Sequence, residues 1–118
     1  MAAKDELGRR GEDVAVQYLE GRGLTVLSRN WRCRHGELDV VATDARCLVV
    51  CEVKTRSGTR FGDPAEAVTG RKAARIRRLA GFWLAAHHLP WTEVRFDVCA
   101  VLMEPGRPAT VSHYESAF

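Results

Sequence analysis

The triplet Glu52-Val53-Lys54 ends an apolar segment and places two opposite charges two positions apart. The segment reads CLVVCEVKT over residues 47–55, and such a nearly continuous apolar run is typical of a strand covered on both faces. Because side chains alternate along a strand, Glu52 and Lys54 project from the same face. A carboxylate and an ammonium at the rim of a core are costly to bury unless they pair or bind something. The triplet is therefore a candidate for chemistry.

A second carboxylate, Asp39, lies on the strand predicted for residues 37–43, and a short link joins this strand to that of Glu52 as a hairpin. Opposite residues of an antiparallel pair share a face, so Asp39 faces Glu52 only if paired residue numbers have an odd sum. Pairing Asp39 with Glu52 or with Val50 meets this condition, and the first pairing leaves a two-residue loop at Ala45-Arg46. A three-residue loop would put Asp39 behind the sheet unless a bulge corrected the register.

If the carboxylates of Asp39 and Glu52 converge, they form a site for a hard divalent cation such as Mg2+ or Mn2+. A cation held there can polarise a phosphoryl oxygen and lower the pKa of a bound water. Lys54 beside it can orient that water or stabilise the negative charge that develops in the reaction. These are the parts needed to hydrolyse a phosphodiester, although a buried salt bridge would explain the same residue types.

The rest of the sequence predicts the elements that position these residues. Helical spacing of apolar residues and strand-like alternation or apolar runs predict helices over 5–21 and 71–88, and strands over 24–32, 37–43, 47–55 and 94–103, with a possible edge strand at 109–114. Asp63-Pro64-Ala65-Glu66 has the form of a separate helix start. This order predicts an α/β fold with a mixed central sheet flanked by helices, in which strand 94–103 can run parallel to a strand of the hairpin.

Two details of this prediction concern the surroundings of the site. Alternation along 37–43 places Leu38, Val40 and Ala42 on one face, opposite to that of Asp39. Gly11 falls on the apolar stripe of the first helix, where the missing side chain would let a strand approach closely.

At Gly36-Glu37-Leu38-Asp39 followed by Glu52-Val53-Lys54, the sequence resembles the PD-(D/E)xK nuclease superfamily. More narrowly, it resembles the YraN-like family of small bacterial proteins, described as predicted endonucleases related to archaeal Holliday junction resolvases. The matching stretches are Gly8 to Glu20, Asn30 to Asp39, Val50 to Arg56, Lys72 to Ala80 and Arg95 to Val98. Leu38 stands where the superfamily name has a proline, which is usual for the YraN-like pattern.

The resemblance implies a restriction-endonuclease-like fold and cleavage of DNA that depends on Mg2+ or Mn2+, with branched or damaged DNA among the substrates. It implies that Asp39 and Glu52 hold the metal, that Lys54 is the catalytic lysine and that Glu12 on the first helix joins the metal site. Similarity to resolvases also implies a homodimer. The residue pattern alone would equally support Glu12 as a solvated helical glutamate.

Basic residues gather in two stretches, Arg29 to Arg34 and Arg71 to Arg78. The candidates for contact with nucleic-acid phosphates are Arg32, Arg34, Arg56, Arg71, Lys72 and Arg75. Arginines interleaved with an aromatic residue such as Trp31 suit nucleic acid, and Trp31 as a core residue of an edge strand is the alternative. For the helical cations the alternative is a solvated basic face, and Lys72 points toward the apolar side of that helix.

Size and composition set the remaining expectations. With 118 residues, the chain is expected to form one domain over residues 1–118, and its net charge of +3 gives only weak support for a nucleic-acid partner. Its four cysteines show no zinc-site spacing and no secretory signal precedes them, so we expect reduced thiols in a cytoplasmic protein. No apolar run approaches the roughly 20 residues that span a bilayer. Two functions stay open: a metal-dependent endonuclease, and a non-catalytic module that binds nucleic acid or protein on the same fold.

Overall fold

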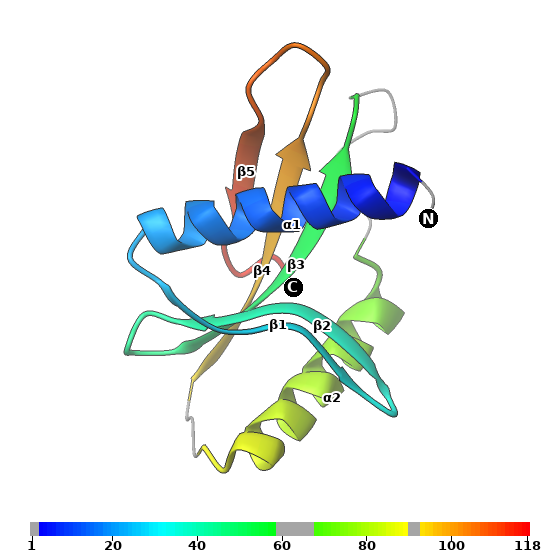
Figure 1. Ribbon diagram of the computed structural model, residues 1–118. Helices are drawn as coiled ribbons and strands as arrows, with labels where there is room; N and C mark the ends of the chain where they lie inside the picture. The colour runs from blue at the N-terminus through cyan, green and yellow to red at the C-terminus, as the bar shows by residue number, and fades with distance from the viewer. Residues whose placement is uncertain (1–2, 59–67, 90–92) are drawn as a thin grey trace.

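The computed structural model describes residues 3–58, 68–89 and 93–118. Its elements are α1 (Ala3–Gly21), β1 (Thr25–Cys33), β2 (Gly36–Thr43), β3 (Leu48–Arg56), α2 (Gly70–His87), β4 (Val94–Leu102) and β5 (Thr110–Tyr114), shown in Figure 1. The long helices and all the strands predicted from the sequence are present, including the final edge strand. The helix start predicted at residues 63–66 lies outside the described residues.

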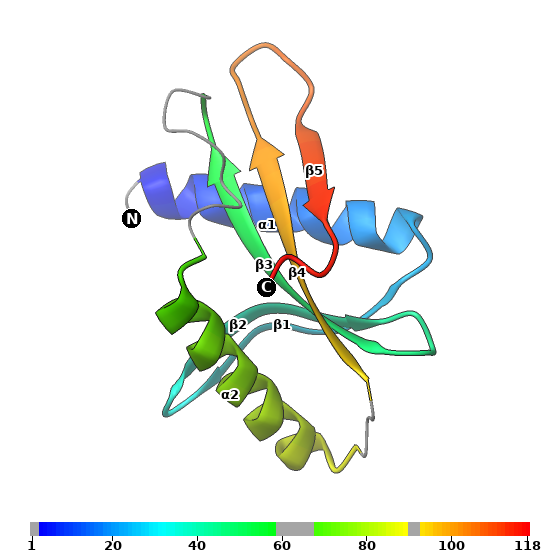
Figure 2. The same cartoon turned by 180° about the vertical axis from the view of Figure 1, so that it is seen from behind.

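The strands form one five-stranded sheet in the order β1-β2-β3-β4-β5. Neighbouring strands are antiparallel except β3 and β4, which run parallel, as the crossover that contains α2 allows. Helix α1 crosses one face of the sheet and α2 lies against the other, as Figures 1 and 2 show from opposite sides. The predicted mixed α/β fold is confirmed, and this arrangement is compatible with a restriction-endonuclease-like fold.

Each helix covers its own apolar cluster, so the central strands β2, β3 and β4 are largely buried on both faces. The cluster under α2 contains Leu38, Val41, Leu48, Val50, Ile76, Leu79, Ala80, Trp83 and Phe96. The cluster under α1 contains Ala15, Val16, Leu19, Val40, Cys51, Cys99 and Val101. All four cysteines are free, as predicted. Within the described residues, no helix is long and apolar enough to cross a membrane.

Helix α2 begins where a side chain satisfies its first backbone donors. Thr69 is the N-cap residue, and its Oγ1 accepts a hydrogen bond of 3.2 Å from the backbone N–H of Lys72. The cap fixes the first turn of α2, from which the side chain of Lys72 reaches that of Lys54 on β3.

Helix α1 approaches β3 closely at Gly11. A Cβ atom placed at this position would clash with the side chain of Thr55, so only glycine fits here. The predicted close approach of a strand at Gly11 is therefore confirmed, and it brings the first turns of α1 over the strand that carries Glu52 and Lys54.

The β2–β3 turn sets the register on which the position of Asp39 depends. The paired residues run from Thr43 with Leu48 to Val40 with Cys51, so their numbers have an odd sum. Asp44 shapes the turn, because its Oδ1 accepts hydrogen bonds from the backbone N–H groups of Arg46 and Cys47 at 2.8 and 2.9 Å. The register predicted from a two-residue loop is confirmed.

The predicted alternation along β2 is wrong at its first half. Leu38 packs in the cluster under α2, whereas Val40, two positions later, packs in the cluster under α1. A flat strand would put both on one face. The reason is a bend: the pairing with β3 extends only to Val40, and beyond it β2 stays paired with β1 through Leu38 and Trp31. The β1–β2 hairpin therefore leaves the sheet as an arm, visible in Figure 1.

Candidate active site

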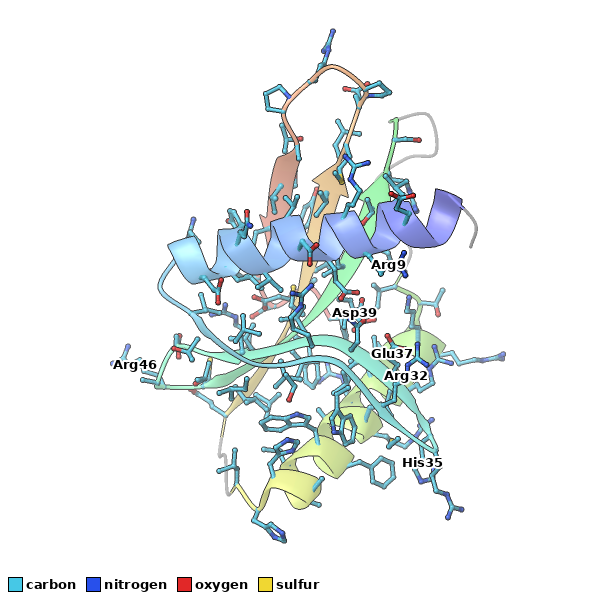
Figure 3. All side chains as sticks on the ribbon, viewed as in Figure 1. Arg9, Arg32, His35, Glu37, Asp39 and Arg46 are labelled. Atoms are coloured by element: carbon cyan, nitrogen blue, oxygen red, sulfur yellow. The ribbon has the colours of Figure 1, made fainter. Side chains whose placement is uncertain are left out.

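Asp39 lies at the point where β2 separates from β3. One position beyond the last pair, Val40 with Cys51, the register brings Asp39 next to Glu52. The Oδ2 atom of Asp39 accepts a hydrogen bond of 2.8 Å from the backbone N–H of Val53, where a strand carbonyl would otherwise be the acceptor. Figure 3 shows Asp39 at the start of the hairpin arm, whereas Arg46 lies at the opposite end of β2. The Asp39 carboxylate thus lies between β2 and β3, where the two strands separate.

Glu52 is a buried carboxylate whose hydrogen bonding is incomplete. Glu52 is only 6% exposed. Among the described residues, no hydrogen-bond donor reaches its buried Oε2 atom. Burial, and next the charge of Asp39, raise the pKa of Glu52 to about 7. Burial also raises the pKa of Asp39, while the N–H of Val53 lowers it. Two acidic groups with raised pKa values therefore share one site, which favours the binding of a cation.

Two lysines from different elements approach this acidic pair. Lys54 follows Glu52 on β3, as strand alternation predicted, and Lys72 comes from the first turn of α2. Burial, and next a side-chain interaction with Lys72, lower the pKa of Lys54 to about 8. Both ammonium groups lower the pKa values of Asp39 and Glu52. Lys72 was predicted only as a phosphate contact, but its position near the carboxylates makes it part of the site.

Glu12 reaches the site from α1 and is held by a residue that the sequence reasoning missed. Nδ2 of Asn30 donates a hydrogen bond of 2.6 Å to Oε1 of Glu12, and Arg29 lies 3.8 Å from the same oxygen. Burial raises the pKa of Glu12, and the negative charge of Asp39 adds to that effect. Asn30 adopts a left-handed φ of 50° within β1, a conformation that asparagine tolerates better than most residues. An asparagine inside a strand segment was the signal that could have identified it.

The donor set fits a hard divalent cation. Carboxylate oxygens are its preferred ligands, and the unpartnered Oε2 of Glu52 supplies a buried acceptor next to the Asp39 carboxylate. In the described part of the chain, no group of three histidine, cysteine or acidic side chains is assembled as a metal site. Two protein carboxylates with water in the other positions suit Mg2+, which keeps several of its waters.

The predicted phosphate-binding arginines occupy different surroundings. The Nε of Arg32 donates a 2.8 Å hydrogen bond to Glu37, and the side chain of Arg32 is 78% exposed. Arg34, Arg71 and Arg75 are exposed. Arg56 is half-buried at the end of β3, and its buried Nε has no hydrogen-bond partner among the described residues. Trp31 packs against the cluster under α2, which is the core role considered as its alternative.

Comparison with known proteins places these features in a family. The chain matches the family described as "Uncharacterised protein family UPF0102" over residues 11–101. The chain belongs to the UPF0102 family. It is 61% identical to a UPF0102 protein of Frankia alni over all of this chain and 98% of the relative, and 59% identical to one of Frankia casuarinae over the whole of both chains. A UPF0102 protein of Nocardia farcinica is 50% identical over 98% of this chain and 91% of the relative.

The family match confirms the narrower resemblance drawn from the motifs, that to YraN-like proteins. The matched range contains every residue of the candidate site: Glu12, Asn30, Asp39, Glu52, Lys54 and Lys72. The site is therefore part of the region that defines the family.

Proposed function

We propose that this UPF0102 protein is a metal-dependent endonuclease of the PD-(D/E)xK type that hydrolyses DNA phosphodiester bonds. The observation that carries the proposal is the buried Glu52 carboxylate, whose Oε2 lacks a partner in the described residues while Asp39 and Lys54 flank it. An acceptor of this kind is costly unless a ligand completes it. The residue types and their order along β2 and β3 support a nuclease site in particular, through the superfamily resemblance.

Each residue of the site would have a distinct part in the reaction. Asp39 and Glu52 would hold Mg2+ or Mn2+, and Glu12 would complete the set if its bond to Asn30 were released. The cation would supply Lewis-acid activation of a phosphoryl oxygen and of a water. Lys54 Nζ lies beside Glu52 and can orient the attacking water or stabilise the charge that develops on the phosphoryl group. Lys72 adds a second positive charge near the same atoms.

The lowered pKa of Lys54 fits a group that exchanges a proton near neutral pH. With a pKa of about 8, the ammonium and the neutral amine are both populated at mildly alkaline pH. A neutral amine can accept a proton from the attacking water, and the ammonium can stabilise negative charge.

For such a protein, a cytoplasmic location is the expected one, since the four free cysteines suit a reducing compartment.

A cleavage assay tests the proposal. Purified protein would be incubated with supercoiled plasmid, a synthetic four-way junction and a flap substrate, each with EDTA and with Mn2+. We expect Mn2+-dependent cleavage that falls at least about 100-fold in Glu52→Gln and in Lys54→Ala. Glu20→Gln, the same substitution at an exposed position of α1, is the matched control and should cleave at the native rate.

Two results would contradict the proposal. Cleavage that persists in both site variants would identify a contaminating nuclease. Binding of these DNA molecules without any cleavage in Mn2+ would favour the non-catalytic binding module instead.

A further inference from the structure

A hollow of about 280 Å3 lies beside α2 and is lined by His35, Arg75, Arg78, Leu79 and Phe82. Its lining combines two flat rings, two guanidinium groups and one aliphatic side chain, and none of the described residues that line it is acidic. Aromatic surface bordered by arginine is the composition with which proteins bind unpaired bases and the phosphates next to them. We call this feature the His35–Phe82 hollow.

The two rings of the hollow are already stacked. Their centroids are 4.3 Å apart and their planes differ by 8°. Phe82 is 40% exposed, which is unusual for a large apolar ring, and His35 is exposed as well. The fold thus presents an accessible ring stack to which a further flat ring can be added.

A glycine holds the hairpin turn against α2 and so fixes this stack. Gly36 has a φ of 146°, and a Cβ there would lie 3.2 Å from Cδ1 of Leu79. The turn can rest on Leu79 because residue 36 has no side chain, and His35 is thereby set over Phe82. Because these rings are ordered before a ligand binds, less conformational entropy is lost on binding.

The hollow and the candidate active site lie along the same hairpin arm. His35 in the turn before β2 and Asp39 on β2 are separated by four positions, which at roughly 3.3 Å per residue of extended chain corresponds to about 13 Å. This distance equals the rise of about four stacked nucleotides at 3.4 Å each. Figure 3 shows His35 toward the tip of the hairpin arm and Asp39 at its base.

We propose that the His35–Phe82 hollow binds an unpaired base of single-stranded DNA, about four nucleotides from the phosphate that is cleaved. The base stacks on the His35–Phe82 rings, and Arg75 and Arg78 contact its flanking phosphates. The preferred substrate class is then DNA with an unpaired segment. This inference rests on the proposed nuclease function for its link to cleavage, but the binding itself can be tested without cleavage.

Fluorescence anisotropy in EDTA measures this binding while the metal-dependent reaction is prevented. The probes are a labelled single strand of about 12 nucleotides and a blunt duplex of the same sequence. We expect Phe82→Leu, which keeps apolar volume and removes the ring, to weaken single-strand binding about 5- to 100-fold. Duplex binding should change less than about twofold, and Phe82→Trp should keep the affinity for the single strand because the aromatic surface is retained.

The arginines are tested through the salt dependence of binding. Replacing both Arg75 and Arg78 by alanine should reduce the slope of log K against log salt concentration by about 1.4 for the single strand, since each lost phosphate contact contributes about 0.7. Arg46→Ala removes an exposed arginine at the opposite end of β2 and should leave the slope and both affinities unchanged.

Native affinity of a folded Phe82→Leu variant for the single strand would overturn the proposal. Equal losses for single strand and duplex would also overturn it, because the ring would then not distinguish unpaired bases. If the native protein does not cleave plasmid, junction or flap DNA in Mn2+ while Phe82→Leu still loses single-strand binding, only the proposed nuclease function is wrong and the proposed base-binding site is supported.

Discussion

Two buried carboxylates on neighbouring strands, Asp97 on β4 and Glu52 on β3, are satisfied to very different degrees. Asp97 is 0% exposed and accepts hydrogen bonds from Nε and Nη2 of Arg95 at 2.9 to 3.2 Å. Its oxygens also lie 2.7 Å from His113 Nε2 and 3.0 Å from the backbone N of Ser116. Glu52 is nearly as buried, yet its Oε2 has no partner in the described residues.

The difference separates a carboxylate that holds the fold together from one that is available to a ligand. The bonds of Asp97 tie β4 to β5 and to the segment after it, through His113 and Ser116. They also raise the pKa of the Arg95 guanidinium. Both oxygens of Asp97 accept hydrogen bonds, whereas in the described part of the chain Oε2 of Glu52 has no donor, and its pKa is raised beside a second acid. A buried carboxylate with a raised pKa and an oxygen that no described residue satisfies is a candidate functional group.

The largest expected effect is on stability, at Asp97. Asp97→Asn should lower the free energy of unfolding by about 3–5 kcal/mol, because it breaks a buried ion pair and leaves Arg95 without its buried partner. Urea unfolding followed by circular dichroism measures this loss. Asp13→Asn is the matched control, since its ion pair with Arg29 is largely exposed and should contribute less than about 1 kcal/mol. Comparable losses of stability in both variants would show that Asp97 contributes no more to the fold than an exposed ion pair does.

The second effect concerns metal at the Glu52 site. At a free Mn2+ concentration of about 100 times its Kd, we expect the native protein to gain about 2.7 kcal/mol of stability over the EDTA form. Glu52→Gln should lose most of this gain because one ligand is weakened, and Glu20→Gln should keep it. Urea unfolding in Mn2+ and in EDTA gives the comparison. An equal gain in the native protein and in Glu52→Gln would place the metal elsewhere.

The smallest effect is the pH dependence of the metal-free protein. The pKa of Glu52 is about 7 when folded, against an ordinary value of 4.5, so between these pH values the folded state holds a proton that the unfolded state has lost. Stability should therefore fall as pH rises from 4.5 through 7. Glu52→Gln removes this penalty and should stabilise the EDTA form by about 1–3 kcal/mol at pH 8, with little change at pH 4.5. Unfolding curves at the two pH values measure the difference, and a destabilised variant at pH 8 would show that Glu52 is satisfied after all.

The sequence predicted much of the site because the signals were local. Apolar runs identified β3, alternation put Glu52 and Lys54 on one face, and Gly11 indicated a close approach that Thr55 confirms. The sequence predicted that Asp39 faces Glu52 if a two-residue loop joins their strands, and the observed β2–β3 register agrees. Metal binding and nuclease activity stay predictions, as does the role of Glu12.

Other features depended on contacts between distant segments. The pattern of β2 gave no sign of the bend that turns Leu38 away from Val40, because the bend arises where β2 leaves β3 and follows β1. Asn30 was passed over since its partner, Glu12, is eighteen residues away on another element.

The sequence by itself determined which segments become helices and strands, and which two charges of β3 lie side by side, because these follow from the chain's own periodicity. Tertiary structure decided that Lys72 joins Lys54 next to the acidic pair and that, across residues 3–58, 68–89 and 93–118, nothing bonds to Oε2 of Glu52. The physical reason is that the satisfaction of a buried polar group depends on every element packed around it. The triplet Glu52-Val53-Lys54 could be found in the sequence, but the incomplete bonding that makes Glu52 a candidate ligand exists only in the fold.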